Sequence, residues 1–273
     1  MRGRAGGFTL VELVVAITIA SIVIAFAALF IGAPVNAYEL ESRRAAVVDE
    51  AAASWPAIEA DLRRALPNSL RARRNGSFVA LELLLVDDYA RYMNGPAVSP
   101  ITVAGGAFRG VAAGNYAGYL SVNNCGPGPP ACPDAYALTT SMTSLPRTIT
   151  VAAAGPGEQT LSVSPAPIFG TDSPRKTIYL VSGPVTYLCD ESRGTLRRYD
   201  NYLVAANQAN RDDAGDFTAV ANQLVATGLT ACDFRASSPS ATVPQTASLR
   251  LTATRATGES VTMFHSAGSG WLP

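Results

Sequence analysis

A single ionisable side chain, the carboxylate of Glu12, lies inside an almost unbroken apolar run at residues 8–33. A helix needs about 20 apolar residues to cross the hydrocarbon core of a bilayer, so this run is long enough for one crossing. A carboxylate inside such a run costs roughly 2.5–3.5 kcal/mol on insertion scales, which makes the acid a functional candidate by default.

The residues before this run form a short basic leader, MRGRAGG, which ends in two glycines. An ordinary secretory signal has an apolar core of 7–15 residues followed by a small-residue cleavage site. Here the apolar run is longer, and the small residues precede it. Phe8 opens the run and Glu12 follows one helical turn later, on the same face of a helix. The arginines of the leader favour a cytoplasmic leader, with the rest of the chain outside.

The basic leader, Gly7, Phe8 and Glu12, followed by a long apolar helix, resemble the class III signal of type IV pilins and type II secretion pseudopilins. The resemblance implies that a prepilin peptidase cuts between Gly7 and Phe8 and methylates the new amino group of Phe8, while the helix is retained. It also implies that Glu12 pairs with the terminal amine of Phe8 on a neighbouring subunit. The alternative is a plain single-pass anchor in which Glu12 snorkels to the nearby interface.

The patterning divides the chain into four segments. We expect a leader at residues 1–7, a transmembrane assembly helix at 8–33, an amphipathic helix at 34–66 that continues into the head, and a β-rich periplasmic head at 67–273. Apolar residues recur at spacings of three and four in the later part of the amphipathic segment, which is typical of one stripe along a helix.

Two prolines, Pro34 and Pro56, occur within the helical part of the chain. Pro34 is expected to kink the helix where it leaves the bilayer. Pro56 either kinks it again or marks a new helix that Ser54 caps, with proline in the first turn. The helix is expected to end near Leu66, because the residue before Pro67 disfavours the helical region.

Beyond Pro67 the sequence favours strands and loops. Residues 249–255 alternate apolar and polar side chains, as a half-buried antiparallel strand does. The dipeptide Thr257-Gly258 predicts a hairpin to the next strand. The predicted strands are 77–86, 137–142, 148–153, 160–164, 177–183, 185–190, 195–202, 231–236, 247–255 and 260–265; residues 94–134 are expected to be a loop, and 217–228 a short helix or irregular connection. A long N-terminal helix followed by strands predicts an α+β fold.

The four cysteines are expected to form disulfides, since an even number outside the cytoplasmic membrane favours pairing. Three connectivities are possible. We favour Cys125 with Cys132, because loop closure favours the local pair, and therefore Cys189 with Cys232. A metal site is the rival interpretation, but the C-x₂₋₄-C spacing of zinc ligands is absent.

Charge and reactive residues favour neither nucleic-acid binding nor catalysis. Basic and acidic residues number 21 each, so no basic surface is indicated. His265 is the only histidine, and a catalytic triad would depend on it alone. The glycine-rich segment 104–110 lacks the Lys-Ser/Thr of a phosphate-binding loop. We therefore expect no enzymatic activity and no resident cofactor.

Asp212, Asp213 and Asp216 form a weak calcium candidate in an oxygen-rich segment. Their spacing does not match the EF-hand template. A solvated loop is the preferred interpretation, although some heads in the pseudopilin family bind calcium.

Segments 61–71, 179–190, 224–234 and 249–265 together resemble a minor pilin-like protein of mannose-sensitive haemagglutinin (MSHA) pilus biogenesis. They also resemble, more loosely, the J-type minor pseudopilin of type II secretion. The resemblance implies a single-pass inner-membrane protein, N-in and C-out with a periplasmic head, which can enter an extracellular pilus. Its implied partners are the prepilin peptidase, other major and minor pilins through the N-terminal helix, and the inner-membrane assembly platform. A membrane-anchored periplasmic binding or enzyme domain is the alternative from another class.

Overall fold

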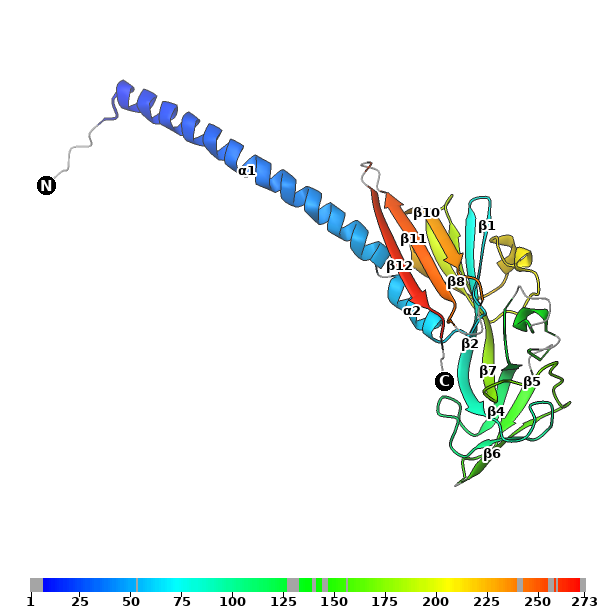
Figure 1. Cartoon of the computed structure of the whole chain (residues 1–273). Helices are drawn as coiled ribbons and strands as arrows, with labels where there is room; N and C mark the ends of the chain where they lie inside the picture. The colour runs from blue at the N-terminus through cyan, green and yellow to red at the C-terminus, as the bar shows by residue number, and fades with distance from the viewer. Residues whose placement is uncertain are drawn as a thin grey trace. The chain divides into compact units, whose positions relative to one another are not determined.

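The computed structural model describes residues 7–52, 54–126, 133–138, 141–143, 147–155, 157–239, 243–254, 258 and 260–270. Its internal contacts divide the chain into two units, Met1–Val48 and Asp49–Pro273. The first is helical and the second is a head built mainly of antiparallel strands (Figure 1). The predicted α+β class is confirmed.

Two helices precede the strands, and the first, α1, spans Leu10–Ala52 and makes up most of the N-terminal unit. Its backbone remains helical through Pro34. A second helix, α2, spans Trp55–Arg63 and carries Pro56 in its first turn. A new helix therefore begins here, as one of the two alternatives stated, because proline needs no backbone N–H partner in the first turn. The expected cap is not formed, since the Ser54 side chain makes no capping hydrogen bond to α2.

Helix α2 ends at Arg63, earlier than the expected end near Leu66. The next residues pair with a strand instead. Leu66 donates its N–H to the Leu84 carbonyl at 2.7 Å, and Val86 donates to the Arg64 carbonyl at 2.8 Å. These bonds satisfy backbone groups that one more helical turn would have satisfied.

Nine strands of the described head form one antiparallel sheet in the order β1-β2-β7-β4-β5-β6-β3, with β8 beside β7 and β9 beside β8. Their bounds are β1 Arg71–Asn75, β2 Phe78–Arg91, β3 Ile101–Ala104, β4 Gly114–Val122, β5 Arg147–Val151, β6 Glu158–Val163, β7 Thr177–Asp190, β8 Thr195–Tyr199 and β9 Asn222–Ala226. Buried side chains of this sheet include Leu84, Ile101, Leu120, Ile149, Leu161 and Leu180.

A second, three-stranded sheet has the order β10-β11-β12. Its strands are β10 Leu229–Ala236, β11 Thr246–Thr254 and β12 Ser260–Gly268. β11 alternates buried and more exposed residues, which confirms the predicted half-buried strand. β11 and β12 pair antiparallel as the hairpin prediction requires, although most of the connecting turn, including Thr257, lies outside the described residues.

Helix α2 contacts both sheets. The hydroxyl of Tyr187 on β7 donates to the Asp61 carboxylate at 2.7 Å, and Arg198 on β8 pairs with the same carboxylate at 2.6 Å. On the other side, the Trp55 indole stacks on the His265 ring of β12, with ring centroids 4.2 Å apart. The helix thus joins the two sheets through one buried acid and one aromatic stack.

Two predicted strands, 177–183 and 185–190, are a single strand, β7. Gly183 and Pro184 suggested a break, but both lie within β7, opposite Leu85 and Leu84 of β2. The register shifts next to this point, between Leu85 and Val86. A proline inside a sheet is tolerated at such an irregularity.

Three other predictions in the head were wrong in their described parts. Residues 137–142 are not a strand, because Ala135–Ala137 forms the short helix η1 and Met142 makes only an isolated bridge. The expected loop 94–134 contains β3 and β4. Residues 217–228 contain β9 after the short helix η3, Gly215–Phe217. For β3, β4 and β9, pairing with other strands decided the structure, which local composition does not encode. Helix η1 instead has a local cause, because the Asp134 side chain accepts the N–H of Tyr136 at its start.

Candidate processing and assembly site

Gly7, Phe8 and Thr9 precede the first residue of α1 and are not helical. Apart from Gly7 and its two chain neighbours, no described residue has a heavy atom within 4 Å of a Cβ placed on Gly7, and Phe8 is 73 % exposed. The peptide bond between Gly7 and Phe8 is therefore accessible in a non-helical segment. A peptidase needs such a segment, because backbone groups inside a helix are already hydrogen-bonded.

Thr9 caps the start of α1. The backbone N–H of Glu12 donates to the Thr9 hydroxyl at 3.3 Å, and the N–H of Leu13 donates to the Thr9 carbonyl at 3.1 Å. This is half of a capping box, in which a threonine precedes a glutamate by three positions. The sequence analysis missed this cap, although the pattern T-x-x-E before an apolar run is a recognised signal.

The cap fixes where the Glu12 carboxylate lies, in the first turn of α1 and exposed. The unbonded N–H groups of a helix N-terminus favour a nearby negative charge. The carboxylate is thus partly stabilised by its own helix and remains accessible to a further cation. Phe8, whose amino group would become the chain terminus after cleavage at Gly7, lies one turn away.

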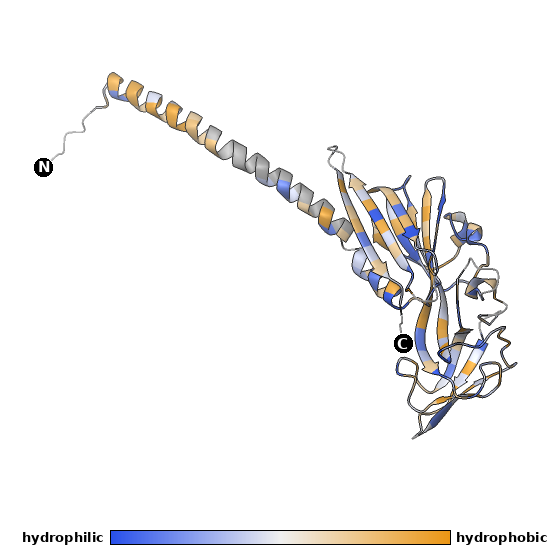
Figure 2. Cartoon of the chain, in the orientation of Figure 1, coloured by the Kyte–Doolittle hydropathy of each residue, from blue (hydrophilic) through white to orange (hydrophobic). Residues whose placement is uncertain are grey.

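The rest of this segment is apolar on every side. The window Leu10–Ala27 has a mean hydropathy of 2.6 and none of it is buried. Figure 2 shows that apolar residues dominate the first part of α1. Among the described residues, α1 is the one helix long and apolar enough to cross a membrane by length and composition. A helix that is apolar all round is buried in a lipid or protein environment.

Two hydroxyl groups inside this window are satisfied by the helix itself. Thr18 donates to the Val15 carbonyl at 2.9 Å, and Ser21 donates to the Thr18 carbonyl at 2.8 Å. Polar groups must be satisfied internally where no water is available. Glu12 is therefore the single charged group that this window presents outward.

The other sequence candidates are engaged by the head. His265 stacks on Trp55, and within the described residues no hydrogen bond joins its imidazole to a carboxylate or hydroxyl. The glycine-rich segment wraps around a buried acid: one oxygen of Asp88 accepts the N–H groups of Arg109, Gly110 and Val111 at 2.7, 2.5 and 3.0 Å. Both features are structural in the described head.

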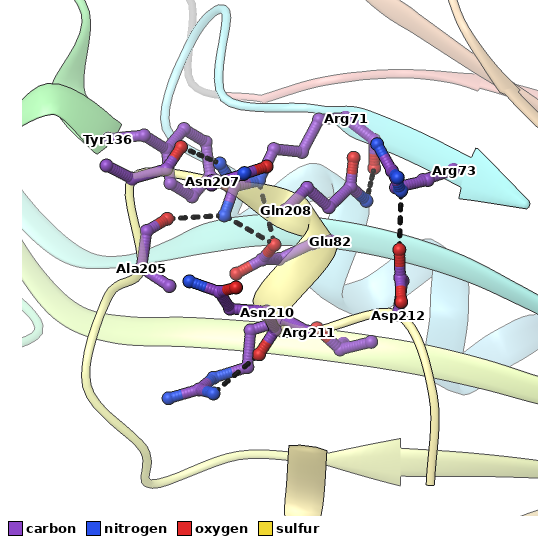
Figure 3. A network of polar contacts seen from close by, with 12 residues as sticks. Arg71, Arg73, Glu82, Tyr136, Ala205, Asn207, Gln208, Asn210, Arg211 and Asp212 are labelled. Carbon is purple, nitrogen blue, oxygen red and sulfur yellow. Dashed lines mark hydrogen bonds and ion pairs between the residues drawn. The ribbon is translucent and has the colours of Figure 1, made fainter. Parts of the chain in front are cut away.

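Asp212, Asp213 and Asp216 do lie together, with their ligand oxygens within 4.8 Å of one another. Their oxygens already accept protein donors. Asp212 pairs with Arg73 and accepts from the Asn75 amide at 2.9 Å, as Figure 3 shows for Arg73. Asp216 accepts the N–H of Asp212 at 2.9 Å. These carboxylates therefore hold the loop together through bonds to protein donors.

Cys189 on β7 and Cys232 on β10 form a disulfide, so the longer of the two expected bridges joins the two sheets. The shorter one, between Cys125 and Cys132, includes Cys132, which lies outside the described residues. Beside the disulfide, Arg74 pairs with Glu191 at 2.8 Å and donates to the Cys232 carbonyl. The hydrogen bond from Arg74 lowers the pKa of Glu191, with the Cys232 N–H contributing in the same direction against the effect of burial.

A buried ion pair that the sequence analysis missed lies in the head (Figure 3). Arg71 on β1 pairs with Glu82 on β2 at 2.7 Å, and the Glu82 side chain is fully buried. The Arg71 guanidinium also lies 3.5 Å from the centre of the Tyr136 ring and donates to the carbonyls of Ala205 and Ala206 at 2.7 and 2.9 Å. Burial raises the pKa of Glu82, and the Arg71 charge opposes that rise. The pair ties the loop after β8 to the sheet.

An open groove of about 540 Å³ lies where α2 meets the loop before β4. It is lined by Arg64, Asp87 and residues 110–116. Arg64 and Tyr116 both bond the Asp87 carboxylate, at 2.7 and 2.9 Å. The charged groups of this groove thus satisfy one another.

Residues 2–28 match the family model of the prokaryotic N-terminal methylation motif. No curated protein and no solved structure matches the chain. The match covers the segment that contains Gly7, Phe8 and Glu12 and leaves the head without a comparison. The motif supports processing by a prepilin peptidase and pilin-type assembly.

Proposed function

We propose that the chain is a minor pilin or pseudopilin that starts or caps the assembly of a type IV, MSHA-like pilus. The prepilin peptidase removes residues 1–7 and methylates Phe8. The exposed apolar helix then carries the protein from the membrane into a filament, where other pilins surround it. The assembly platform of the inner membrane and the other pilins are its partners.

The observation that carries this proposal is the methylation motif at residues 2–28, placed on a helix with one exposed acid and an apolar surface. A plain anchor explains the apolar surface. It does not explain a carboxylate fixed in the first helical turn, one turn after an accessible Gly7–Phe8 bond. An ion pair between Glu12 and the amine of a neighbouring Phe8 explains the carboxylate and the bond next to it, because each charge offsets the free-energy cost of placing the other in an apolar environment.

The size of the head supports a low copy number. A head of about 200 residues has an expected radius of gyration of about 16 Å. A filament whose helices are tightly packed leaves little room for such a head at every position. A place at the tip, or in the complex that primes assembly, accommodates it. The J-type pseudopilin of type II secretion satisfies the same size argument and is the competing assignment.

Intact-mass measurement after co-expression with a prepilin peptidase tests the processing step. We expect loss of residues 1–7 and gain of one methyl group. Gly7→Val should block cleavage, because a branched side chain then occupies the scissile position. Gly3→Val is the matched control, since it makes the same change in the leader away from the bond and should be cleaved normally. An uncut wild-type chain would remove the basis of the proposal.

Deletion of the gene in its own host separates pilus from secretion. Loss of surface filaments, seen by electron microscopy, with normal export of secreted enzymes is expected for the pilus role. The reverse result assigns the chain to type II secretion. Normal filaments together with normal export would contradict both and favour an anchored periplasmic domain.

A further inference from the structure

The three-stranded sheet of the head has two edges, formed by β10 and β12 (Figure 1). An edge strand presents unpaired backbone N–H and C=O groups, which can pair with another chain. Natural proteins therefore cover such edges or blunt them with charges, prolines, bulges or short strands. The two edges of this sheet differ in how the rest of the head treats them.

The β10 edge is blocked by side chains at Cys232. The N–H of Cys232 donates to the Glu191 carboxylate at 2.8 Å, and its carbonyl accepts from Arg74. Arg74 and Glu191 also pair with each other. The two side chains occupy both outward backbone groups of Cys232, which a neighbouring strand would otherwise bind.

The β12 edge has no such cover in the described residues. The N–H of Ser269 donates to the Gln245 carbonyl at 2.6 Å, so these two residues form a hydrogen-bonded pair. The register of β11 with β12 then shows which of the other pairs are hydrogen-bonded. Because residues of an antiparallel pair alternate between bonded and unbonded positions, every second residue of β12 points its backbone groups outward. The outward residues are Ser260, Thr262, Phe264, Ser266 and Gly268. No described group bonds the backbone of Thr262, Phe264 or Ser266 from that side.

The sequence of β12 also lacks the usual protective devices. Its nine residues contain no Lys, Arg, Asp, Glu or Pro, and its register with β11 has no shift. Phe264, at its centre, is 65 % exposed. By contrast, β1 carries three arginines, and β3 and β9 are only four and five residues long. A long, uncharged edge with an exposed aromatic is a template for strand pairing.

We propose that β12 pairs antiparallel with β12 of a second copy of this chain, about a two-fold axis at Phe264. This register pairs all nine residues of the strand. Phe264 faces Phe264 of the second copy, and Thr262 faces Ser266 of the second copy. On the other face of the sheet, Met263 faces His265. Aromatic pairs and hydroxyl pairs are both favourable across strands, and no like charges meet.

Among the described residues, the charge next to the centre of this edge is Arg250. Arg250 on β11 lies opposite Phe264, so each arginine adjoins an aromatic side chain. In the pair, the two Arg250 positions are separated by three strand spacings, about 14 Å. That distance exceeds the Debye length of about 8 Å at physiological ionic strength, so their repulsion is screened. Arg250 therefore does not oppose pairing with a second copy.

This interface belongs to the head and does not depend on the proposed pilin role. A direct test uses cysteine crosslinking of the full chain in detergent. Residues paired through backbone hydrogen bonds have Cα atoms about 5.5 Å apart, which lies within the range of a disulfide. Phe264→Cys should therefore form a covalent dimer on mild oxidation.

The matched control is Thr262→Cys. In the proposed register Thr262 lies about 14 Å along the strand from Thr262 of the second copy, which is too far for a disulfide. Thr262→Cys alone should give no dimer, but mixed with Ser266→Cys it should give one. Equal crosslinking of Phe264→Cys and Thr262→Cys, or none in any variant, would overturn the proposal. Crosslinking of Phe264→Cys only to a co-expressed pilin would assign the edge to a different subunit and reject the second copy.

A proline variant tests the backbone contribution. Phe264→Pro removes an outward N–H and leaves the β11 ladder intact, since proline is tolerated at such positions of edge strands. The dimer seen by size-exclusion chromatography with light scattering should be lost, with thermal unfolding unchanged. Phe264→Leu keeps the N–H and should keep the dimer. A dimer that survives Phe264→Pro contradicts strand pairing.

Discussion

The backbone N–H of Glu12 donates to the Thr9 hydroxyl at 3.3 Å, which sets the acid of the apolar helix at the third position of its first turn. The same residue is thus part of a helix cap and the one charge that the apolar segment presents. These two roles make different demands. The cap needs the backbone N–H of residue 12 and the hydroxyl of residue 9, whereas pairing with an amine needs the negative charge.

Replacing Glu12 by Gln separates the two roles. The amide keeps the shape and the backbone cap but removes the charge, so we expect normal cleavage and membrane insertion. Incorporation into sheared filaments, measured by immunoblot, should fall at least about tenfold, equivalent to about 1.4 kcal/mol. Thr9→Val is the control, because it removes a cap worth about 1 kcal/mol and keeps the charge. Equal incorporation of Glu12→Gln and wild type would show that the charge serves only as an anchor near the interface.

We expect the stability of the head to depend strongly on both partners of the Arg71–Glu82 pair. Glu82→Leu alone leaves the Arg71 charge buried without its partner and should destabilise the head by about 3–5 kcal/mol. The double variant Arg71→Met with Glu82→Leu should recover much of that loss, because paired apolar replacements are often neutral. Denaturant unfolding of the full chain in detergent measures both. A double variant no more stable than Glu82→Leu would indicate that the bonds of Arg71 to Ala205 and Ala206 dominate.

The Cys189–Cys232 disulfide closes a sequence separation of 43 residues. The chain-entropy treatment of such a loop gives about 4 kcal/mol of stabilisation at 25 °C. Replacing both cysteines by alanine should therefore lower the unfolding midpoint markedly, and adding reductant to the variant should change it less than in wild type. A midpoint unaffected by the double replacement would mean that Arg74 and Glu191 suffice to join the sheets.

Glu191 predicts a loss of stability in acid. Its folded pKa lies below the ordinary value of 4.5 because Arg74 and the Cys232 N–H bond its charged form. A depressed folded pKa gives stability that is present above pH 4.5 and disappears as the pH falls through the folded value. The difference in melting temperature between wild type and Glu191→Gln should therefore shrink between pH 6 and pH 3. A constant difference would assign the effect to packing.

We expect the Asp88 carboxylate to keep the glycine-rich loop ordered. Its carboxylate accepts three backbone N–H groups, and Asp88→Ala would remove these bonds, each contributing about 0.5–1.5 kcal/mol. Limited trypsin digestion should then cut after Arg109 much faster than in wild type. Asp87→Asn, which alters the neighbouring acid that bonds Arg64 and Tyr116, is the control and should leave that rate nearly unchanged. Unchanged cleavage in Asp88→Ala would contradict the role of the carboxylate.

The N-terminal segment is the part that the sequence predicted best. An apolar run, a basic leader and one acid are local features, and a helix satisfies its own backbone, so no distant residue is needed to specify it. The strand prediction at residues 247–255 succeeded for a related reason, because alternation along one strand records which face is buried.

The head was predicted only in outline. β3 and β4 were hidden in a stretch rich in glycine and alanine, and β7 crosses a Gly-Pro dipeptide that locally indicates a break. Both depend on partners far away in the chain, and strand propensity is largely a matter of such neighbours. The missed ion pair of Arg71 and Glu82 has the same origin, since nothing in either local sequence marks its burial.

The sequence by itself therefore determined the α+β class, the methylation-motif segment at residues 2–28 and the apolar helix that begins in it, because local order along the chain encodes these features. The tertiary structure alone decided which polar groups form hydrogen bonds within the head and which remain exposed to a partner. It directs Arg74 and Glu191 to one edge of the small sheet, while the β12 edge has no such cover among the described residues. Strand order and hydrogen-bonding register arise only when distant segments pair, so no local pattern could have shown that β10 and β12 are the edges of this sheet.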